Sequence, residues 1–209
     1  MYTLYYSPGA ASLLPHLLLL EIGAAHELRR VDIQAGDNRT PEYLSLNPNG
    51  AVPTLIVDGQ ACAETAALLL LLCERHPEAG LAPAVGTPTR AAFLQGVLFL
   101  ANTLQPTFRL WFYPSDAGAV DEDALRQGLR KRIERCFDQL AGQLGDGRPY
   151  LLGEQPSALD FYATMLMRWS RNMPRPATEW PALKALADRI RARPSWQRLY
   201  EIEGLTEWT

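Results

Sequence analysis

The sequence predicts an α/β domain followed by an all-helical domain. Strand and helix patterns alternate from the N-terminus as far as Cys73. Residues 77–88 then hold three prolines and two glycines, a composition typical of a linker. Beyond this linker helical periodicity recurs and no strand pattern returns. We therefore expect domains at residues 1–80 and 86–209.

Composition limits the classes of protein to consider. The 209 residues are 47% apolar, which is enough for a real core. The formal net charge of −3, with mixed signs, does not indicate a nucleic-acid or membrane partner. No apolar run approaches the roughly 20 residues of a membrane span, and the N-terminus lacks a charged leader. Cys62, Cys73 and Cys136 form no C-x-x-C pair, so we expect neither disulfides nor a zinc site. These features favour a cytoplasmic protein.

The first elements predict a parallel strand pair joined by a helix. Tyr2 to Tyr6 is a short aromatic and β-branched strand, which Ser7-Pro8-Gly9 interrupts. Ala10 to Ile22 is apolar almost all round, as in a buried helix, and Gly23 is its expected C-cap. Glu27 to Ile33 is the second strand. A strand–helix–strand connection without a hairpin implies a right-handed parallel crossover.

The next elements complete a thioredoxin-like order. Pro41 to Leu46 is a short helix with proline at its first position and a threonine before it as N-cap. Thr54 to Val57 and Gln60 to Ala63 are strands joined by a tight turn at Asp58-Gly59. Ala66 to Cys73 is a buried helix. The resulting order, β-α-β-α-β-β-α, is the thioredoxin-like one.

The stretch from Asn47 to Leu55 is the most informative motif. Pro48 and Gly50 mark a turn, and Pro53 precedes a strand, where proline cannot donate to the sheet. A cis Val52-Pro53 bond is expected there. It would present the N–H and C=O of Val52 as an open edge for an extended peptide. Glu64-Thr65 follows at a helix N-terminus, which favours an anionic group.

The second domain is predicted from helical periodicity alone. Ser157-Ala158-Leu159-Asp160 is a variant of the capping box, with a role in folding and not in catalysis. We expect helices over residues 89–111, 122–144, 157–172, 182–191 and 195–201.

Two stretches carry a family resemblance. The sequence resembles the N-terminal domain of glutathione transferases of the bacterial beta type. The stretches that carry this resemblance are Asn47 to Leu72 and Tyr5-Tyr6-Ser7-Pro8-Gly9-Ala10-Ala11-Ser12-Leu13. The resemblance extends over nearly the whole chain. It implies conjugation of the glutathione thiol to small hydrophobic electrophiles, with glutathione as co-substrate and no metal. It also implies a homodimer.

The resemblance assigns the glutathione-binding residues. Val52 and Pro53 would pair with the cysteinyl backbone of glutathione. Glu64 would hold the ammonium of the γ-glutamyl group, and Thr65 its α-carboxylate. The alternative is that Glu64 and Thr65 only stabilise the helix start.

The beta-type cysteine is missing, because Ala11 occupies its position. Mixed-disulfide chemistry there is excluded, so the sulfur must be stabilised by Ser12, Tyr6, Ser7 or backbone N–H groups. Alternatively, Ser12 is an ordinary helix-start serine and Tyr6 a half-buried strand aromatic.

Other expected contacts follow from the resemblance. Arg39 is the one cation in the loop before the proline turn, and it would meet the glycine carboxylate. Gln105 stands where relatives place a histidine that reaches glutathione from the partner subunit. The aromatic run Phe108 to Tyr113 would wall the electrophile pocket between the domains, although a role in the core or the dimer interface is equally consistent.

Two other functions remain open from the sequence. A non-catalytic protein could use the same cradle to carry glutathione or a hydrophobic ligand. A glutathione-dependent reductase or peroxidase would also need the cradle.

Overall fold

The computed structural model describes residues 1–118 and 121–208. Contacts divide the chain into two compact units. The first contains residues 1–82 together with residues 191–208, and the second contains residues 83–190. The boundaries expected from sequence, 1–80 and 86–209, keep residues 191–208 with the helical domain, whereas contacts group them with the first unit.

The first unit is built on a four-stranded sheet in the order β2-β1-β3-β4. β1 (Tyr2–Tyr6) pairs parallel with β2 (His26–Arg30), as the helical crossover predicts. β3 (Thr54–Val57) runs antiparallel to both β1 and β4 (Gln60–Ala63). The element order β-α-β-α-β-β-α confirms the thioredoxin-like prediction.

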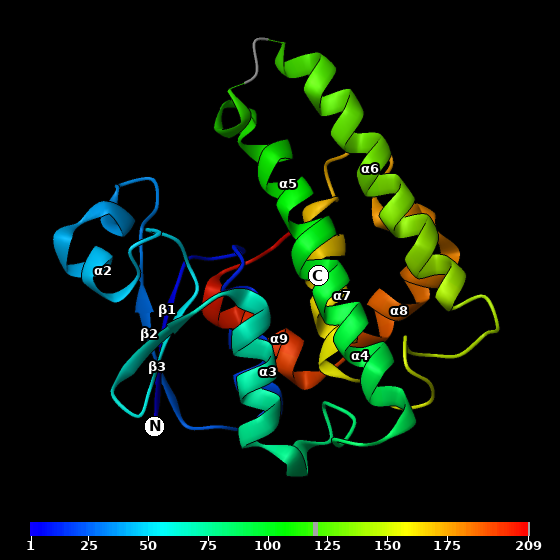
Figure 1. Ribbon diagram of the computed structural model, residues 1–209, viewed down its shortest axis with the longest axis horizontal. Coiled ribbons are helices and arrows are strands. Elements are labelled where there is room, and N and C mark those ends of the chain that lie inside the picture. Colours follow the sequence, from blue (N-terminus) through cyan, green and yellow to red (C-terminus); the bar gives the residue numbers. More distant parts are fainter. Residues whose placement is uncertain (119–120, 209) are drawn as a thin grey trace. The chain divides into compact units, whose positions relative to one another are not determined.

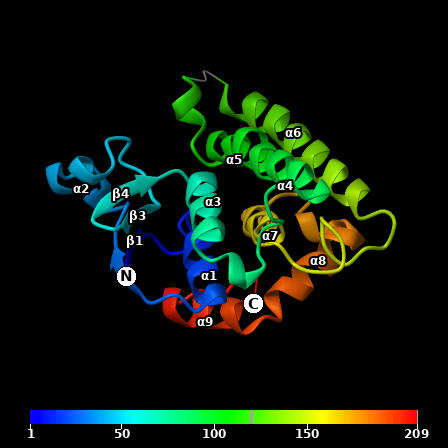
Figure 2. The same ribbon diagram turned by 60° about the horizontal axis from the view of Figure 1, so that its bottom comes forward.

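Helices cover both faces of this sheet. α1 (Leu13–Ile22) and α3 (Thr65–Arg75) pack against each other on one face. α2 (Pro41–Leu46) lies on the opposite face in both views (Figures 1 and 2). The leucines of α1 from Leu13 to Leu19 are fully buried, which explains why this helix is apolar almost all round.

Local sequence signals set several boundaries of these elements. Gly23 ends α1 in the left-handed region with φ 74°. Asp58 and Gly59 both have positive φ, as the tight β3–β4 turn requires. The Thr40 hydroxyl caps α2 by accepting from the N–H of Tyr43 at 3.3 Å. α1 begins three residues later than predicted, because Ala10 still closes a turn with its N–H on the Ser7 carbonyl.

The last helix, α9 (Pro194–Glu203), packs against α1. Glu21 near the end of α1 accepts hydrogen bonds from the Arg193 guanidinium and, at 2.5 Å, from the Ser195 hydroxyl. These bonds satisfy a partly buried carboxylate, which would otherwise be costly to desolvate. The residues nearest the C-terminus therefore complete the first unit.

The second unit is all-helical. Its helices are α4 (Pro88–Phe99), α5 (Gln105–Phe112), α6 (Glu122–Gln143), α7 (Ala158–Trp169) and α8 (Pro181–Arg191). A π-helical turn, Leu100–Leu104, interrupts the helix that the sequence predicts as continuous. Pro106 has no N–H to continue the regular ladder across this point. Short 3-10 turns occupy Asp37–Arg39, Pro77–Ala79, Pro114–Ala117 and Ala177–Glu179.

α7 is the buried centre of the helical unit, and its capping box is present as predicted. The Ser157 N–H and hydroxyl donate to the Asp160 carboxylate at 2.8 and 2.9 Å. The Leu151 N–H donates to the same carboxylate at 2.8 Å. Burial raises the pKa of Asp160, although these donors oppose the shift. The box thus ties the loop before α7 to its first turn.

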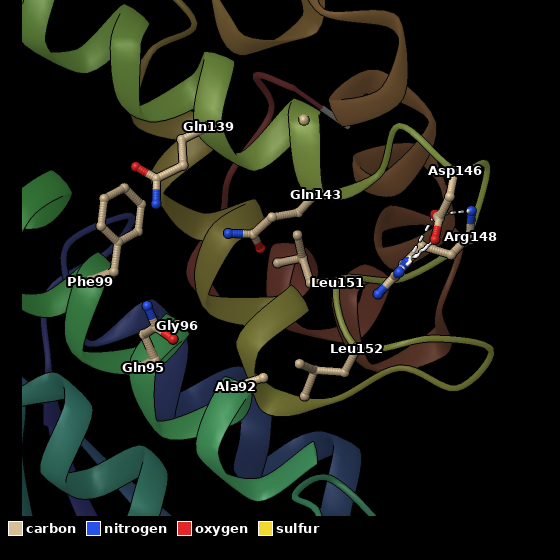
Figure 3. A pocket seen from close by; sticks show the side chains of 11 residues that line it. Ala92, Gln95, Gly96, Phe99, Gln139, Gln143, Asp146, Arg148, Leu151 and Leu152 are labelled. Atoms are coloured by element: carbon tan, nitrogen blue, oxygen red, sulfur yellow. Dashed lines mark hydrogen bonds and ion pairs between the residues drawn. The ribbon is translucent and has the colours of Figure 1, made fainter. Parts of the chain in front are cut away.

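The helical unit also contains an open cavity of about 460 Å³ (Figure 3). Its walls come from α4, from the C-terminal turns of α6 and from the loop that follows α6. No residue expected from sequence to bind glutathione lines it.

Candidate functional site

The predicted binding residues of the first unit gather at one end of the sheet. Thr54 pairs with Tyr5 on one side and with Ala63 on the other. The residues that follow β1 and β4 and those that precede β3 therefore share an end of the sheet. This end carries Tyr6, Val52 and Glu64.

A buried polar network shapes the proline turn, and the sequence did not reveal it. The Tyr43 hydroxyl and the Asn47 amide donate to the Ala51 carbonyl at 2.7 and 2.8 Å. Both side chains also contact the Thr54 hydroxyl, at 3.0 and 3.2 Å. The Asn47 side chain accepts from the Asn49 N–H in a local turn, which is the one feature a sequence pattern could have signalled. Fully satisfied, such a network fixes the turn rigidly.

The turn leaves the backbone of Val52 open. The Val52-Pro53 peptide bond is cis, as predicted. The Val52 side chain packs against Val31 and Tyr43. Among the described residues its N–H and C=O have no hydrogen-bond partner. An open donor and acceptor on one residue suit pairing with an extended peptide.

Glu64 and Thr65 join β4 to α3 at the same end. Glu64 has φ 72° and ψ 114°, an unusual conformation for a residue other than glycine. Its side chain is exposed and does not cap the helix. Thr65 begins α3 and is buried. An exposed carboxylate therefore stands beside a helix N-terminus, where backbone N–H groups favour an anion.

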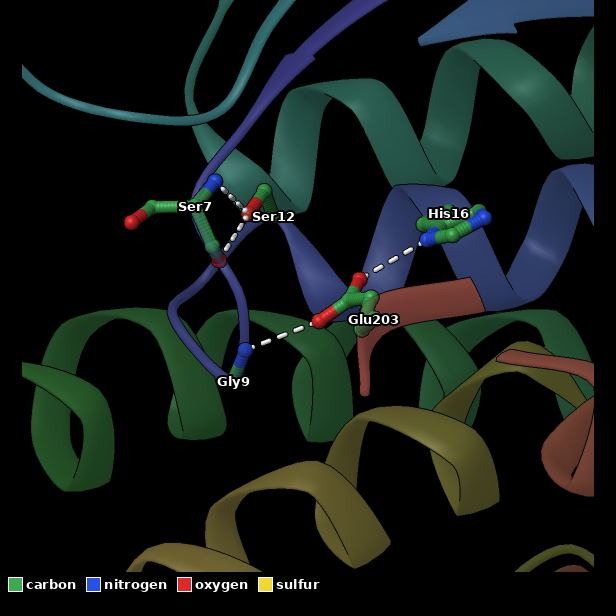
Figure 4. Close-up of polar contacts among 5 residues, drawn as sticks. All are labelled: Ser7, Gly9, Ser12, His16 and Glu203. Atoms are coloured by element: carbon green, nitrogen blue, oxygen red, sulfur yellow. Dashed lines mark hydrogen bonds and ion pairs between the residues drawn. The ribbon is translucent and has the colours of Figure 1, made fainter. Parts of the chain in front are cut away.

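At the start of α1, the Ser12 side chain forms hydrogen bonds with the loop that precedes the helix (Figure 4). The Ser12 side chain is fully buried. Its hydroxyl donates to the Ser7 carbonyl and accepts from the Ser7 N–H, each at 3.1 Å. This hydroxyl also does not cap the helix. A hydroxyl held in this way links the start of α1 to the backbone of Ser7.

Backbone donors remain at this helix start. The N–H groups of Ala11 and Ser12 have no acceptor within the part of the chain that the structure describes. Ala11 is the position that the sequence matched to the beta-type cysteine. Unsatisfied N–H groups and the helix dipole favour negative charge at this point.

A residue of α9 also contacts the Ser7–Gly9 loop. Glu203 accepts from the Gly9 N–H at 2.8 Å and lies 2.7 Å from Nδ1 of His16 (Figure 4). The side chains of both Glu203 and His16 are fully buried. Sequence analysis did not predict this pair, because a single histidine and a single glutamate 187 residues apart form no recognisable pattern.

The polar groups of the Tyr6 and Arg39 side chains are not engaged by other described residues. The Tyr6 hydroxyl has no hydrogen-bond partner among the described residues, and its ring lies 5.9 Å from that of His16. Arg39 is exposed and forms no ion pair within residues 1–118 and 121–208. A Cβ added at Gly50 would lie 2.7 Å from Nη1 of Arg39, so the guanidinium covers the proline turn.

Gln105 belongs to the helical unit. It begins α5 directly after the π-helical turn, and its side-chain oxygen accepts a hydrogen bond from the Tyr162 hydroxyl. This bond fixes the amide against α7.

Comparison with known proteins matches both halves of the chain. Residues 12–75 match the N-terminal domain of glutathione S-transferases, and residues 123–199 match the C-terminal domain. A curated glutathione S-transferase of Xanthomonas campestris is 32% identical over 206 residues, which cover 97% of this chain and 98% of that protein. The chain belongs to the glutathione S-transferase family. It is thus a member of an enzyme family whose relatives match it over their full length.

Solved structures of the glutathione S-transferase family agree with this fold. A sphingomonad glutathione S-transferase in complex with glutathione has a TM-score of 0.86 at 30% identity. A bacterial beta-class enzyme of Sphingomonas chungbukensis has a TM-score of 0.86 at 31% identity. Each comparison covers 98% of this chain and 100% of the other. The predicted resemblance to the beta type is therefore confirmed, because the similar solved structures include a beta-class enzyme.

The described residues contain no group of three or more His, Cys, Asp or Glu side chains arranged to hold a metal ion. Within the same residues, no helix combines the length and apolar character that crossing a membrane demands.

Proposed function

We propose that this protein conjugates the thiol of glutathione to small hydrophobic electrophiles. The glutathione thiolate attacks an electrophilic carbon, a carbon–sulfur bond forms, and the bond to a leaving group breaks. The open backbone of Val52, at the same end of the sheet as Glu64-Thr65, is the observation that carries the proposal. An extended peptide bearing an amino acid group at one end fits these three residues.

Glutathione is placed by the chemistry of its groups. The N–H and C=O of Val52 pair with the cysteinyl backbone, as in strand addition. The Glu64 carboxylate holds the γ-glutamyl ammonium, a charge-assisted bond. Thr65 and the N-terminus of α3 hold the α-carboxylate, since that helix end favours anions.

The sulfur is stabilised by the start of α1. Backbone N–H groups of Ala11 and Ser12 point to this role, because they have no acceptor in the described chain. The Tyr6 hydroxyl is the side-chain donor, in place of the Ser12 hydroxyl that Ser7 engages. Favouring the thiolate lowers the thiol pKa and supplies the nucleophile at neutral pH.

Two further contacts belong to the same proposal. Arg39 meets the glycine carboxylate from beside the proline turn. The protein acts as a homodimer, in which Gln105 approaches the glutathione of the partner subunit; its bond to Tyr162 would hold the amide in place.

The proposal is tested by titration and by turnover. Calorimetry should show glutathione binding to the parent, with affinity lower by about 1–3 kcal/mol in Glu64→Ala because a charged hydrogen bond is lost. Glu154→Gln removes an exposed carboxylate from the helical unit and should leave affinity unchanged. Equal affinity in Glu64→Ala and the parent would refute the placement.

Assays separate conjugation from its rivals. Turnover of chlorodinitrobenzene with glutathione supports conjugation. Binding of glutathione without turnover of any electrophile in a panel would indicate a carrier instead. Consumption of glutathione with formation of its disulfide, from peroxide or disulfide substrates alone, would indicate a reductase or peroxidase. Light scattering on the purified chain tests the dimer.

A further inference from the structure

The open cavity of the helical unit is lined by both apolar and polar side chains. Its volume of about 460 Å³ is within the range of sites that hold drug-sized ligands. Phe99 of α4 and Gln139 of α6 face each other at one end, and the aliphatic side chains of Leu151 and Leu152 line the other part (Figure 3). The cavity therefore offers an aromatic face and an apolar floor.

Three primary amides converge on this cavity. Gln95 comes from α4, and Gln139 and Gln143 come from the last turns of α6. Within the described residues none of these three amides has a hydrogen-bond partner in the protein. Each amide offers both donors and an acceptor, so together they match a ligand that carries a donor and an acceptor close together.

The charges at the rim cancel. Asp146 accepts from the Arg148 guanidinium at 2.5 to 2.9 Å and forms an ion pair with it. The Arg148 side chain lowers the pKa of Asp146 to about 2, so the carboxylate is charged at neutral pH. A ligand with a net charge would have to compete with this pair, whereas an uncharged ligand would not.

We propose that this cavity is a second ligand site that binds an uncharged aromatic amide or lactam. The ring stacks on Phe99 and lies against the leucines, while the amide group exchanges hydrogen bonds with the glutamines. Offset stacking on an aromatic ring and paired amide bonds each give specificity beyond apolar burial. The site does not rest on the proposed conjugation, since it shares no residue with the glutathione cradle.

The glycines of α6 supply a matched pair of test substitutions. Gly142 lines the cavity, and a Cβ added there would meet no atom within 4 Å. Gly128 lies on the same helix, also has open space, and does not line the cavity. Leucine at either position replaces a glycine of α6 by a residue with a higher helix propensity. Only leucine at 142 fills the cavity.

The experiment uses the full chain and benzanilide, a neutral aromatic amide, as the probe in ligand-observed NMR titrations. The parent and Gly128→Leu should bind it alike, and Gly142→Leu should bind at least about tenfold more weakly. Replacing both Gln139 and Gln143 by leucine should weaken binding about five- to tenfold, as expected for lost hydrogen bonds. The carboxylated probe 4-benzamidobenzoate should bind more weakly than benzanilide.

Saturating glutathione should leave benzanilide affinity unchanged, because the two sites share no residue. No binding to the parent, equal binding to Gly142→Leu and Gly128→Leu, or displacement by glutathione would each overturn the proposal. Retained affinity after loss of both glutamines would overturn amide recognition. These outcomes do not depend on whether the chain conjugates glutathione.

Discussion

Oε1 of Glu203 lies 2.7 Å from Nδ1 of His16, in a pair whose side chains are both fully buried. The other carboxylate oxygen accepts from the Gly9 N–H at 2.8 Å. One residue of α9 thus holds both α1 and the loop that precedes it. Because that loop also carries Ser7, the pair connects the C-terminal helix to the proposed sulfur site.

Glu203→Ala should destabilise the fold. It removes the carboxylate that accepts from the Gly9 N–H and pairs with the buried His16 ring, and loss of a partner to a buried polar group costs about 1–3 kcal/mol. We expect a loss of about 2–4 kcal/mol in the free energy of unfolding, measured by denaturant titration. Glu203→Gln should cost less, because its amide can still accept from Gly9 and donate to His16.

The control for this change is Glu201→Ala. Glu201 is on the same helix but is exposed and pairs with Arg198 at 2.9 Å. Exposed pairs contribute little, so this variant should stay within about 1 kcal/mol of the parent. If Glu203→Ala lowers the free energy of unfolding no more than Glu201→Ala does, the buried contacts of Glu203 do not stabilise the fold.

Ser12→Ala should act on stability and leave the sulfur chemistry in place. The substitution removes both bonds to the Ser7 backbone, and we expect a loss of about 1–3 kcal/mol. The rising limb of the pH–rate profile should keep its position, whereas Tyr6→Phe should move it to higher pH. A shift of the limb in Ser12→Ala without loss of stability would restore the catalytic role expected from the sequence.

Tyr43→Phe should loosen the proline turn. It removes the donor to the Ala51 carbonyl, so both the stability and the glutathione affinity should fall, by about 1 kcal/mol each. Burial raises the pKa of Tyr43 above its usual value near 10. The unfolded chain therefore loses the Tyr43 proton at a lower pH than the folded protein does. As a result, the free energy of unfolding falls as pH rises above about 10. The difference in the free energy of unfolding between the parent and Tyr43→Phe should become smaller between pH 9 and 11. A difference that stays constant over this range would contradict the prediction.

Local signals predicted most of the first unit. Gly23, Thr40 and Asp58-Gly59 each set a boundary by their own backbone or side-chain preferences, and the structure has them in those roles. The start of α1 was missed by three residues because the helix propensity of Ala10 lost to a turn closed on Ser7. The break before Gln105 was missed because helical periodicity alone does not register a π-helical turn.

The site was predictable where it depends on backbone shape and less so where it depends on distant contacts. Val52 and Glu64 belong to a short motif whose spacing carries its own geometry. The burial of Ser12 and its bonds to Ser7 depend on tertiary packing. The bridge from Glu203 to Gly9 and His16 spans almost the whole chain, and only folding brings those residues together.

The three cysteines should take no part in conjugation. Cys73 and Cys136 are buried, Cys62 is half-buried on β4, and burial raises the pKa of Cys136. A thiol reagent should therefore modify Cys62 first at neutral pH, as mass spectrometry would show. Turnover should persist when all three are replaced by alanine, provided circular dichroism shows an intact fold. A mixed disulfide with glutathione formed during turnover would contradict this expectation.

Arg39→Gln should weaken binding of glutathione through its glycine carboxylate. Arg39 is exposed and forms no ion pair with any described residue, and its guanidinium covers Gly50 in the proline turn. An exposed charge pair contributes at most about 1 kcal/mol, so the expected loss is about two- to fivefold in affinity, smaller at high salt. The glycyl ethyl ester of glutathione removes the charge from the ligand. The parent should bind the ester about two- to fivefold more weakly than glutathione, whereas Arg39→Gln should bind both ligands equally. If Arg39→Gln still discriminates against the ester as the parent does, another group holds the glycine carboxylate.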